Sequence, residues 1–232
     1  MRFLKSFSLG VLLLPLTLAT LTRLPAALLS LQNQMDSLAL IFSGVVAYVL
    51  IEVIFERPMR TYVFGHELTH ALASIAMGGK VHSFNVSKDG GSVSLSKTNF
   101  FVALAPYCIP IYAIFVFLLF WGLKAFYPSE SLNTAFLLLM GMTLAFHGSL
   151  TLYAIRQKQP DIKKTGTFFS VIFIALMNGW ILAGLSKLLF WNSFAASSFV
   201  LDVMRTQADI WKWIWAGSIN LIKLGADLTN RK

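Results

Sequence analysis

The chain has 232 residues, of which 56% are hydrophobic and 12% are charged, and its formal net charge is +9. Soluble domains carry about 25% charged residues, so this composition argues against an ordinary soluble enzyme and against a disordered chain. The single cysteine, Cys108, excludes an internal disulfide. Lysines and arginines stand mainly at the ends of apolar runs, where they would contact lipid headgroups, so we expect no nucleic-acid partner.

Two apolar segments, 7–29 and 38–55, come first in the chain. The first follows a short basic stretch, Met1-Arg2-Phe3-Leu4-Lys5, which is typical of a signal peptide. No small-residue cleavage site with a soluble domain comes after it, so we expect a retained membrane helix. The second segment contains Glu52, which we expect to pair with an arginine such as Arg57 or to reach the membrane surface.

The next two segments are an apolar stretch with one charge and a pair of short strands. Residues 61–79 carry Glu67 as their one charged side chain, and we expect a third membrane helix there. Residues 80–86 and 92–96 flank Asp89-Gly90, which is a strong hairpin signal. We therefore expect a small β-hairpin directly after this helix.

Three later stretches contain no Asp, Glu, Lys or Arg, and each is long enough to cross a hydrocarbon core of roughly 30 Å. They lie between Lys97 and Lys124, between Glu130 and Arg156, and between Lys164 and Lys187. Pro106 and Pro110 are expected to loosen the helix in the first stretch. With the upstream segments, these stretches predict about six membrane helices.

From about Val200 the sequence predicts an amphipathic helix with three tryptophans, Trp211, Trp213 and Trp215. Tryptophans in such a helix favour a position at the bilayer interface over a seventh span. The expected fold class is therefore an all-α, multi-pass integral membrane protein with a small membrane-associated hairpin. We expect one integral domain over residues 1–198 and the interfacial helix over residues 199–232.

His66-Glu67-Leu68-Thr69-His70 is the most informative motif. A helix places residues i and i+4 on one face, so His66 and His70 can bind one zinc ion, Zn²⁺, and Glu67 can take a proton from zinc-bound water. The chain has only 4 histidines and 10 acids, and three of them gather in this apolar segment. Each ionisable group at membrane depth costs roughly 2.5–3.5 kcal/mol, so a function explains the cluster better than mutual hydrogen bonding in a helix bundle.

This motif, together with Gly78-Gly79-Lys80-Val81, Gly90-Gly91 and the hydrophobic helix that follows, resembles the site-2 protease family of intramembrane zinc metalloproteases. The resemblance covers about residues 60–165. It implies a zinc enzyme that cuts a membrane-spanning protein substrate within the lipid bilayer. It also implies that the hairpin holds the substrate as an added strand, and Val81, Phe84 and Val86 are the candidate substrate-binding residues there.

The third zinc ligand has two candidates in the sequence. The family uses an aspartate in an Asn/Pro-rich stretch that ends in Asp-Gly, and no such stretch follows here. If residues 61–79, 99–123 and 131–153 each cross the membrane once, His147 lies at a depth similar to that of His70, so we favour His147. Asp161, in Gln159-Pro160-Asp161, is the alternative ligand, or a residue that orients His147.

Asn178 is a further candidate for substrate binding, because its side chain can hydrogen-bond an extended backbone, although hydrogen bonding to a neighbouring helix is the more common role. Two other functions stay open. One is a non-catalytic membrane protein that keeps the protease fold to bind or chaperone partners. The other is a metal transporter, which usually spreads ionisable residues over several depths and shows repeated halves.

Overall fold

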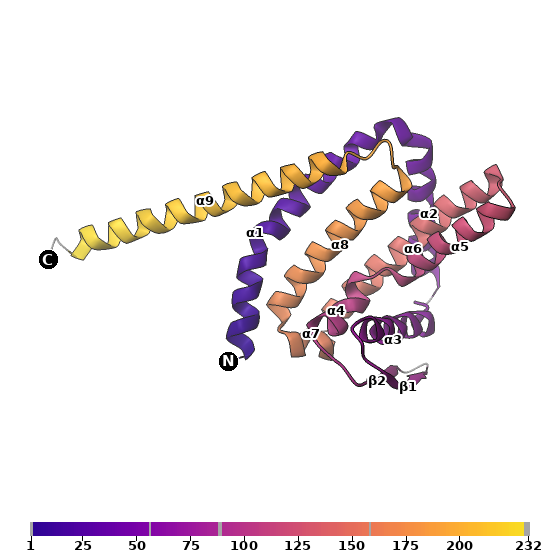
Figure 1. The fold of residues 1–232 in the computed structure, drawn as a ribbon, viewed down its shortest axis with the longest axis horizontal. Helices are drawn as coiled ribbons and strands as arrows, with labels where there is room; N and C mark the ends of the chain where they lie inside the picture. Colours follow the sequence, from indigo (N-terminus) through magenta and orange to yellow (C-terminus); the bar gives the residue numbers. More distant parts are fainter. Residues whose placement is uncertain (1, 56, 88–89, 158, 230–232) are drawn as a thin grey trace. The chain divides into compact units, whose positions relative to one another are not determined.

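The computed structural model describes residues 2–55, 57–87, 90–157 and 159–229, and it is mainly helical (Figure 1). In chain order its elements are α1 (Arg2–Leu29), a 3₁₀ helix (Ser30–Gln34), α2 (Met35–Ile54), α3 (Met59–Ala76), β1 (Val81–Val86), β2 (Gly91–Leu95), α4 (Phe100–Cys108), α5 (Ile111–Phe126), α6 (Glu130–Arg156), α7 (Pro160–Thr165), α8 (Thr167–Leu189) and α9 (Ala196–Thr229). The chain divides into two compact units, one of Met1–Gln32 with Ala175–Lys232 and the other of Asn33–Ile174.

In the unit of residues 33–174, α2 and α6 pack closely because each presents a glycine to the backbone of the other. A Cβ atom on Gly44 would lie 2.0 Å from the carbonyl oxygen of Leu138, and one on Gly141 would lie 1.9 Å from that of Ile41. Small residues allow this close approach, which is a common way to join helices in membranes. Near the end of α2, Glu52 accepts hydrogen bonds from Arg57 at 2.6 Å and from Ser149 of α6 at 2.5 Å, which confirms the predicted Glu52–Arg57 pair.

The predicted loosening of the helix at Pro106 and Pro110 is a full break. Helix α4 ends at Cys108, Ile109 is extended, and α5 starts at Ile111 after a bend of 65°. Proline lacks an N–H group and disfavours helical geometry in the residue before it, which explains why the break falls at Ile109-Pro110.

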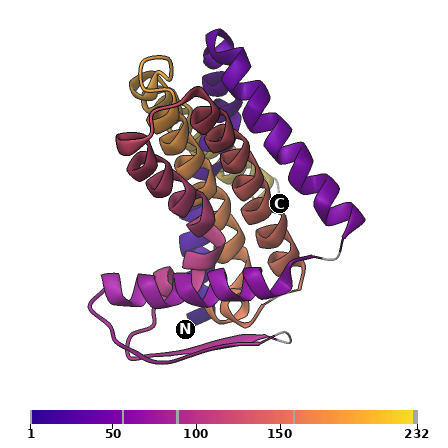
Figure 2. The same ribbon diagram turned by 90° about the vertical axis from the view of Figure 1, so that its right-hand side faces the viewer.

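Helix α3 lies crosswise to α2 and α6 at one end of the unit, and the hairpin lies on the far side of α3 (Figure 2). The helix ends at Ala76 and is followed by Gly78, whose φ of 73° is the left-handed conformation that glycine adopts readily after a helix. The hairpin is confirmed: β1 and β2 are antiparallel, and Phe84 pairs with Val93 and Val86 with Gly91. Asp89 of the predicted turn lies outside the described residues.

In the other unit, α1 packs against α9. Arg23 of α1 donates a hydrogen bond to the hydroxyl of Thr206 at 2.7 Å, and Trp180 of α8 makes an edge contact with Phe199 of α9. Further along α9, Trp213 and Trp215 are 78% and 72% exposed. The helix starts at Ala196, close to the expected start of the amphipathic helix, and the domain of residues 1–198 stays a prediction.

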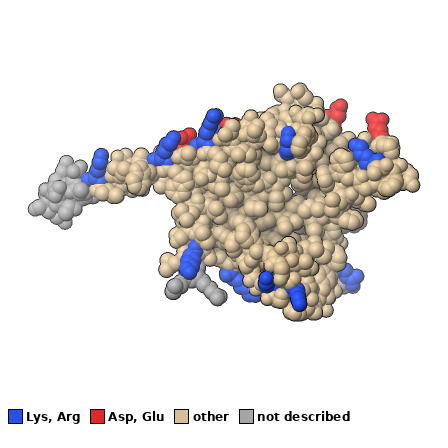
Figure 3. Space-filling view, in the orientation of Figure 1, with Lys and Arg blue, Asp and Glu red and all other residues tan. Residues whose placement is uncertain are grey.

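Within the described residues, three helical segments are long and apolar enough to cross a membrane, or four if the bent pair α4–α5 is one span. They are Leu4–Ile54, Glu130–Arg156 and Thr167–Leu189, so the predicted six spans are not supported. Helix α3 is not among them because Arg60, His66 and Glu67 lower its hydropathy over only 18 residues. In the view of Figure 3, uncharged side chains make up most of the surface that is drawn, as expected for a membrane protein.

The glycine contact between α2 and α6 predicts the effect of adding a single methyl group. Gly141→Ala should destabilise the protein by about 1–3 kcal/mol, because the new methyl group forces the two helices apart. The measurement is the thermal unfolding midpoint of the purified protein in detergent. Gly148→Ala is the matched control, because a Cβ there meets no atom within 4 Å on the same helix. Equal midpoints for the two variants would contradict the packing described above.

Candidate metal site

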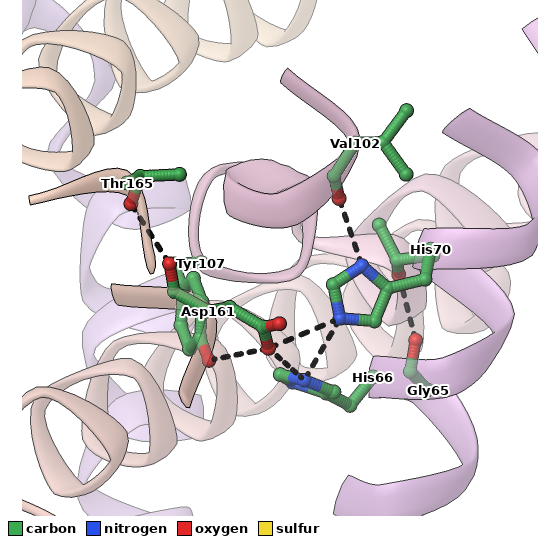
Figure 4. Close-up of polar contacts among 8 residues, drawn as sticks. Gly65, His66, His70, Val102, Tyr107, Asp161 and Thr165 are labelled. Carbon is green, nitrogen blue, oxygen red and sulfur yellow. Dashed lines mark hydrogen bonds and ion pairs between the residues drawn. The ribbon is translucent and has the colours of Figure 1, made fainter. Parts of the chain in front are cut away.

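Two helices bring three possible metal ligands together (Figure 4). His66 and His70 lie one turn apart on α3, and Asp161 comes from α7. One ligand atom from each of these three residues lies within 4.8 Å of the other two. Among the described residues this is the one group of three or more His, Cys, Asp or Glu side chains with such spacing.

Asp161 reaches the histidines because α7 is a short, well-fixed helix. Pro160 occupies the start of α7, where a missing N–H costs no helical hydrogen bond, and Ile162 is fully buried. Thr165 donates a hydrogen bond to the backbone carbonyl of Asp161 at 2.8 Å, and Gly166, with φ of 94°, ends the helix. On the side-chain carboxylate, Tyr107 of α4 donates a hydrogen bond at 3.5 Å. The backbone of Asp161 is therefore fixed within α7, and its carboxylate is held from α4.

The spacing of the three ligand atoms fits a zinc ion. Nε2 of His66 and Nε2 of His70 are 3.2 Å apart, and Oδ2 of Asp161 lies 3.4 Å from the His70 atom and 3.7 Å from the His66 atom. A tetrahedral zinc ion with ligands at about 2.0–2.1 Å requires ligand atoms about 3.3 Å apart. Two nitrogens and one carboxylate oxygen are also a ligand set that zinc accepts, with a fourth position left for water or substrate.

His70 is oriented by a backbone carbonyl that a proline leaves without its helical partner. Nδ1 of His70 donates a hydrogen bond to the carbonyl oxygen of Val102 at 2.8 Å. In α4 that carbonyl would normally accept from the N–H four residues later, but the residue there is Pro106, which has none. Because Nδ1 carries a proton, Nε2 of the neutral imidazole is the atom that can present its lone pair to a metal, as metal-binding histidines require.

Charge and burial act together on the titratable groups of the site. Burial disfavours the charged form of Asp161, but hydrogen bonds from His66 and His70 outweigh it and hold the pKa of this carboxyl well below its usual value. Burial also opposes the charged form of His70, and its hydrogen bond to Asp161 outweighs this and raises the pKa of His70. The pKa of Glu67 is raised, chiefly by burial, although the two histidines partly offset this effect.

The hairpin lies directly against this part of α3. A Cβ atom on Gly91 of β2 would lie 2.7 Å from Cγ of Glu67 and 2.6 Å from Cγ1 of Val63, so only glycine permits this contact. Phe84 of β1 makes an edge contact with Phe64 at a centroid distance of 5.9 Å. The apolar face of the hairpin is thus turned toward the helix that carries the ligands.

The sequence had favoured His147 over Asp161 as third ligand, and the geometry brings Asp161 to the histidines instead. His147 lies on α6, where it lines a small cavity together with His66. His147 and His70 lie at a similar depth only if α3 crosses the membrane in parallel with the later helices, whereas α3 lies crosswise to α6 (Figure 2).

Substrate binding by Val81, Phe84, Val86 and Asn178 stays a prediction. Phe84 is 37% and Val86 36% exposed, Val81 is partly buried, and all three lie on β1. Asn178 lies on α8 in the other unit.

Residues that the motif alone does not reveal complete the surroundings of the ligands. Tyr107 and Tyr62 place their rings 5.3 Å and 5.4 Å from the ring of His66, and Val102 supplies the carbonyl for His70. Pro106, four residues after Val102, is the signal in the sequence that this carbonyl is available.

No family model, curated protein or solved structure matches the chain in comparisons with known proteins. The function is therefore argued from the residues of the site.

Asp161→Ala should abolish stoichiometric zinc binding, because two imidazoles alone hold zinc far more weakly than three ligands. The measurement is zinc content of the purified full chain after dialysis at a fixed free zinc concentration. Asp209→Ala, which removes an exposed aspartate of α9, is the control and should keep the wild-type content. Full zinc retention by Asp161→Ala would remove Asp161 from the ligand set.

Pro106→Ala should weaken zinc binding by about tenfold without abolishing it, because the restored N–H competes with His70 for the Val102 carbonyl. A competition titration with a chromophoric chelator measures the affinity. Pro128→Ala, at an exposed position before α6, is the matched control. An affinity equal to that of the wild type would show that the His70–Val102 hydrogen bond does not orient the ligand.

Proposed function

We propose that the chain is a zinc metalloprotease that hydrolyses peptide bonds of membrane-spanning proteins within the bilayer. The observation that carries this proposal is the convergence of His66, His70 and Asp161 at separations suited to tetrahedral zinc, with Glu67 next to His66 on the same helix. Helices long and apolar enough to cross a membrane support the membrane setting.

The roles of the residues follow from their positions. His66, His70 and Asp161 would hold the zinc ion, which when bound lowers the pKa of water toward about 7 and polarises a peptide carbonyl. Glu67 takes a proton from the attacking water as its oxygen bonds to the carbonyl carbon. As the C–N bond breaks, Glu67 delivers that proton to the leaving nitrogen, which departs as an amine.

The surroundings of Glu67 suit this exchange. The residue is 9% exposed, and burial raises its pKa, which is the direction that suits a general base. The carboxylate of Asp161 retains 27% exposure, whereas the His66 and His70 side chains retain 11% and 9%. The open side of the ligand group is therefore the side of Asp161, from which water and substrate would approach.

The hairpin supports a peptide substrate over a small molecule. A membrane-spanning helix must unwind before its peptide bonds can be attacked, and an extended segment can then pair with a strand edge. In the hairpin, the backbone N–H of Ser87 donates a hydrogen bond to the carbonyl of Gly90, and hydrogen-bonded pairs alternate with non-hydrogen-bonded pairs along an antiparallel ladder. Phe84 and Val86 therefore direct their backbone groups away from β2. A segment added at this edge of β1 would run beside the helix that bears the ligands.

Glu67→Gln should lower the cleavage rate by about 10²–10⁴-fold while zinc content stays at the wild-type level, because the amide cannot accept the proton. The assay is cleavage of a co-expressed single-span membrane protein that the wild-type chain cuts, together with metal analysis of both proteins. Glu130→Gln, at an exposed site in the first turn of α6, is the matched control.

Two other results would point away from a protease. Peptide-bond cleavage that is unchanged in Glu67→Gln would remove the assigned base. Zinc binding by a wild-type protein that cuts none of a broad panel of membrane substrates would favour a protein that binds partners without cleaving them.

A further inference from the structure

A small polar cavity lies behind His66, on the side of α3 that faces α6. It has a volume of about 30 Å³, and Pro106, Ile109 and Leu150 form part of its apolar wall. Its lining includes the polar side chains of Tyr62, His66, Thr69, Thr143, His147 and Thr151. About 10–15 Å³ is enough for one water molecule, so this cavity has room for one or two.

Two of the residues that line the cavity carry buried polar atoms without a hydrogen-bond partner among the described residues. They are Nδ1 of His66 and the hydroxyl oxygen of Tyr62. A buried polar atom without a partner is destabilising, and nearly all buried polar atoms in native proteins bond to protein groups or to ordered water. Both residues line the same cavity, which is large enough for water, so the same solvent can serve both.

The two histidines of the ligand group differ in the hydrogen-bond partner of Nδ1. His70 donates its Nδ1 proton to the carbonyl of Val102. His66 must also donate its second ring N–H if Nε2 is to face the metal. In the described part of the chain, no backbone carbonyl accepts a hydrogen bond from Nδ1 of His66. A water in the cavity can accept this proton.

Such a water needs acceptors for its own protons, and the cavity wall provides them. The hydroxyls of Thr69 and Thr143 donate to the carbonyls of Gly65 and Leu139 at 2.7 Å and 2.8 Å, which leaves their oxygen lone pairs available. The imidazole of His147 adds a group that can either donate or accept.

We propose that this cavity holds ordered water that accepts the Nδ1 proton of His66, and that His147 is a positioning residue which anchors this water. His147 thus acts on the metal site through His66 and is not a ligand. The inference rests on the metal site of the proposed function, but it does not require that the protein cleave peptides.

The test measures metal binding by the full-length protein in detergent, without any assay of activity. Zinc affinity is measured by chelator competition for the wild type and for His147→Leu, His147→Gln and Tyr62→Phe. The visible absorption of the cobalt-loaded protein reports the ligand set. His82→Leu, which replaces an exposed histidine of β1, is the matched control.

We expect His147→Leu to bind zinc about tenfold more weakly than the wild type, with an unchanged cobalt spectrum. His147→Gln should restore most of the affinity, because the amide also hydrogen-bonds water, and Tyr62→Phe should weaken binding by a few-fold. Tyr62→Phe removes one hydroxyl only, so it tests the water cluster even if His147→Leu fails to fold.

Several results would overturn the inference. Wild-type affinity in both His147→Leu and Tyr62→Phe would exclude a role for the cavity. Loss of the cobalt bands in His147→Leu would make His147 a ligand, and equal weakening by leucine and glutamine would mean a packing role. Absence of zinc from the wild type would overturn the metal site itself, whereas zinc binding without proteolysis would overturn only the proposed activity.

Discussion

The carboxylate of Asp161 lies 3.4 Å and 3.7 Å from Nε2 atoms of two histidines, in a partly buried position where a neighbouring positive charge stabilises it. The raised pKa of His70 and the lowered pKa of Asp161 both reflect the attraction between these two groups. A divalent cation would stabilise the carboxylate more fully, since it attracts all three ligand atoms at once. The rest of the unit of residues 33–174 serves to hold these three side chains in place.

Proline and glycine do much of this positioning. Pro106 leaves the carbonyl of Val102 available to His70, and Pro160 starts the short helix that carries Asp161. Gly91 lets the hairpin lie against Glu67, and the contact between Gly44 and Gly141 joins α2 to α6, the helix that carries His147. Each of these positions depends on what the residue lacks, either an N–H group or a Cβ atom.

Much of the site could be predicted from the sequence because the two ligands on α3, His66 and His70, are close together in the sequence. The i, i+4 spacing of His66 and His70 fixes their relation within one helix, and the turn sequence after residue 80 predicts the hairpin. The order of preference between His147 and Asp161 could not be predicted in the same way. It depends on the crosswise direction of α3 and on the short helix α7, and both are set by tertiary packing that no local pattern encodes. The predicted number of spans is too high partly because 61–79 is not a crossing helix. In addition, residues 4–54 form a single helical segment that covers two of the predicted spans, and α4 and α5 are a bent pair.

The central claim is that one metal ion is held by two imidazoles and one carboxylate. Zinc K-edge X-ray absorption of the purified, zinc-loaded full chain tests it most directly. The account predicts scattering from two imidazole rings, with nitrogen and oxygen ligands at about 2.0–2.2 Å and no sulfur. A spectrum that requires three imidazoles, or a protein that retains no zinc after removal of excess metal, would contradict it.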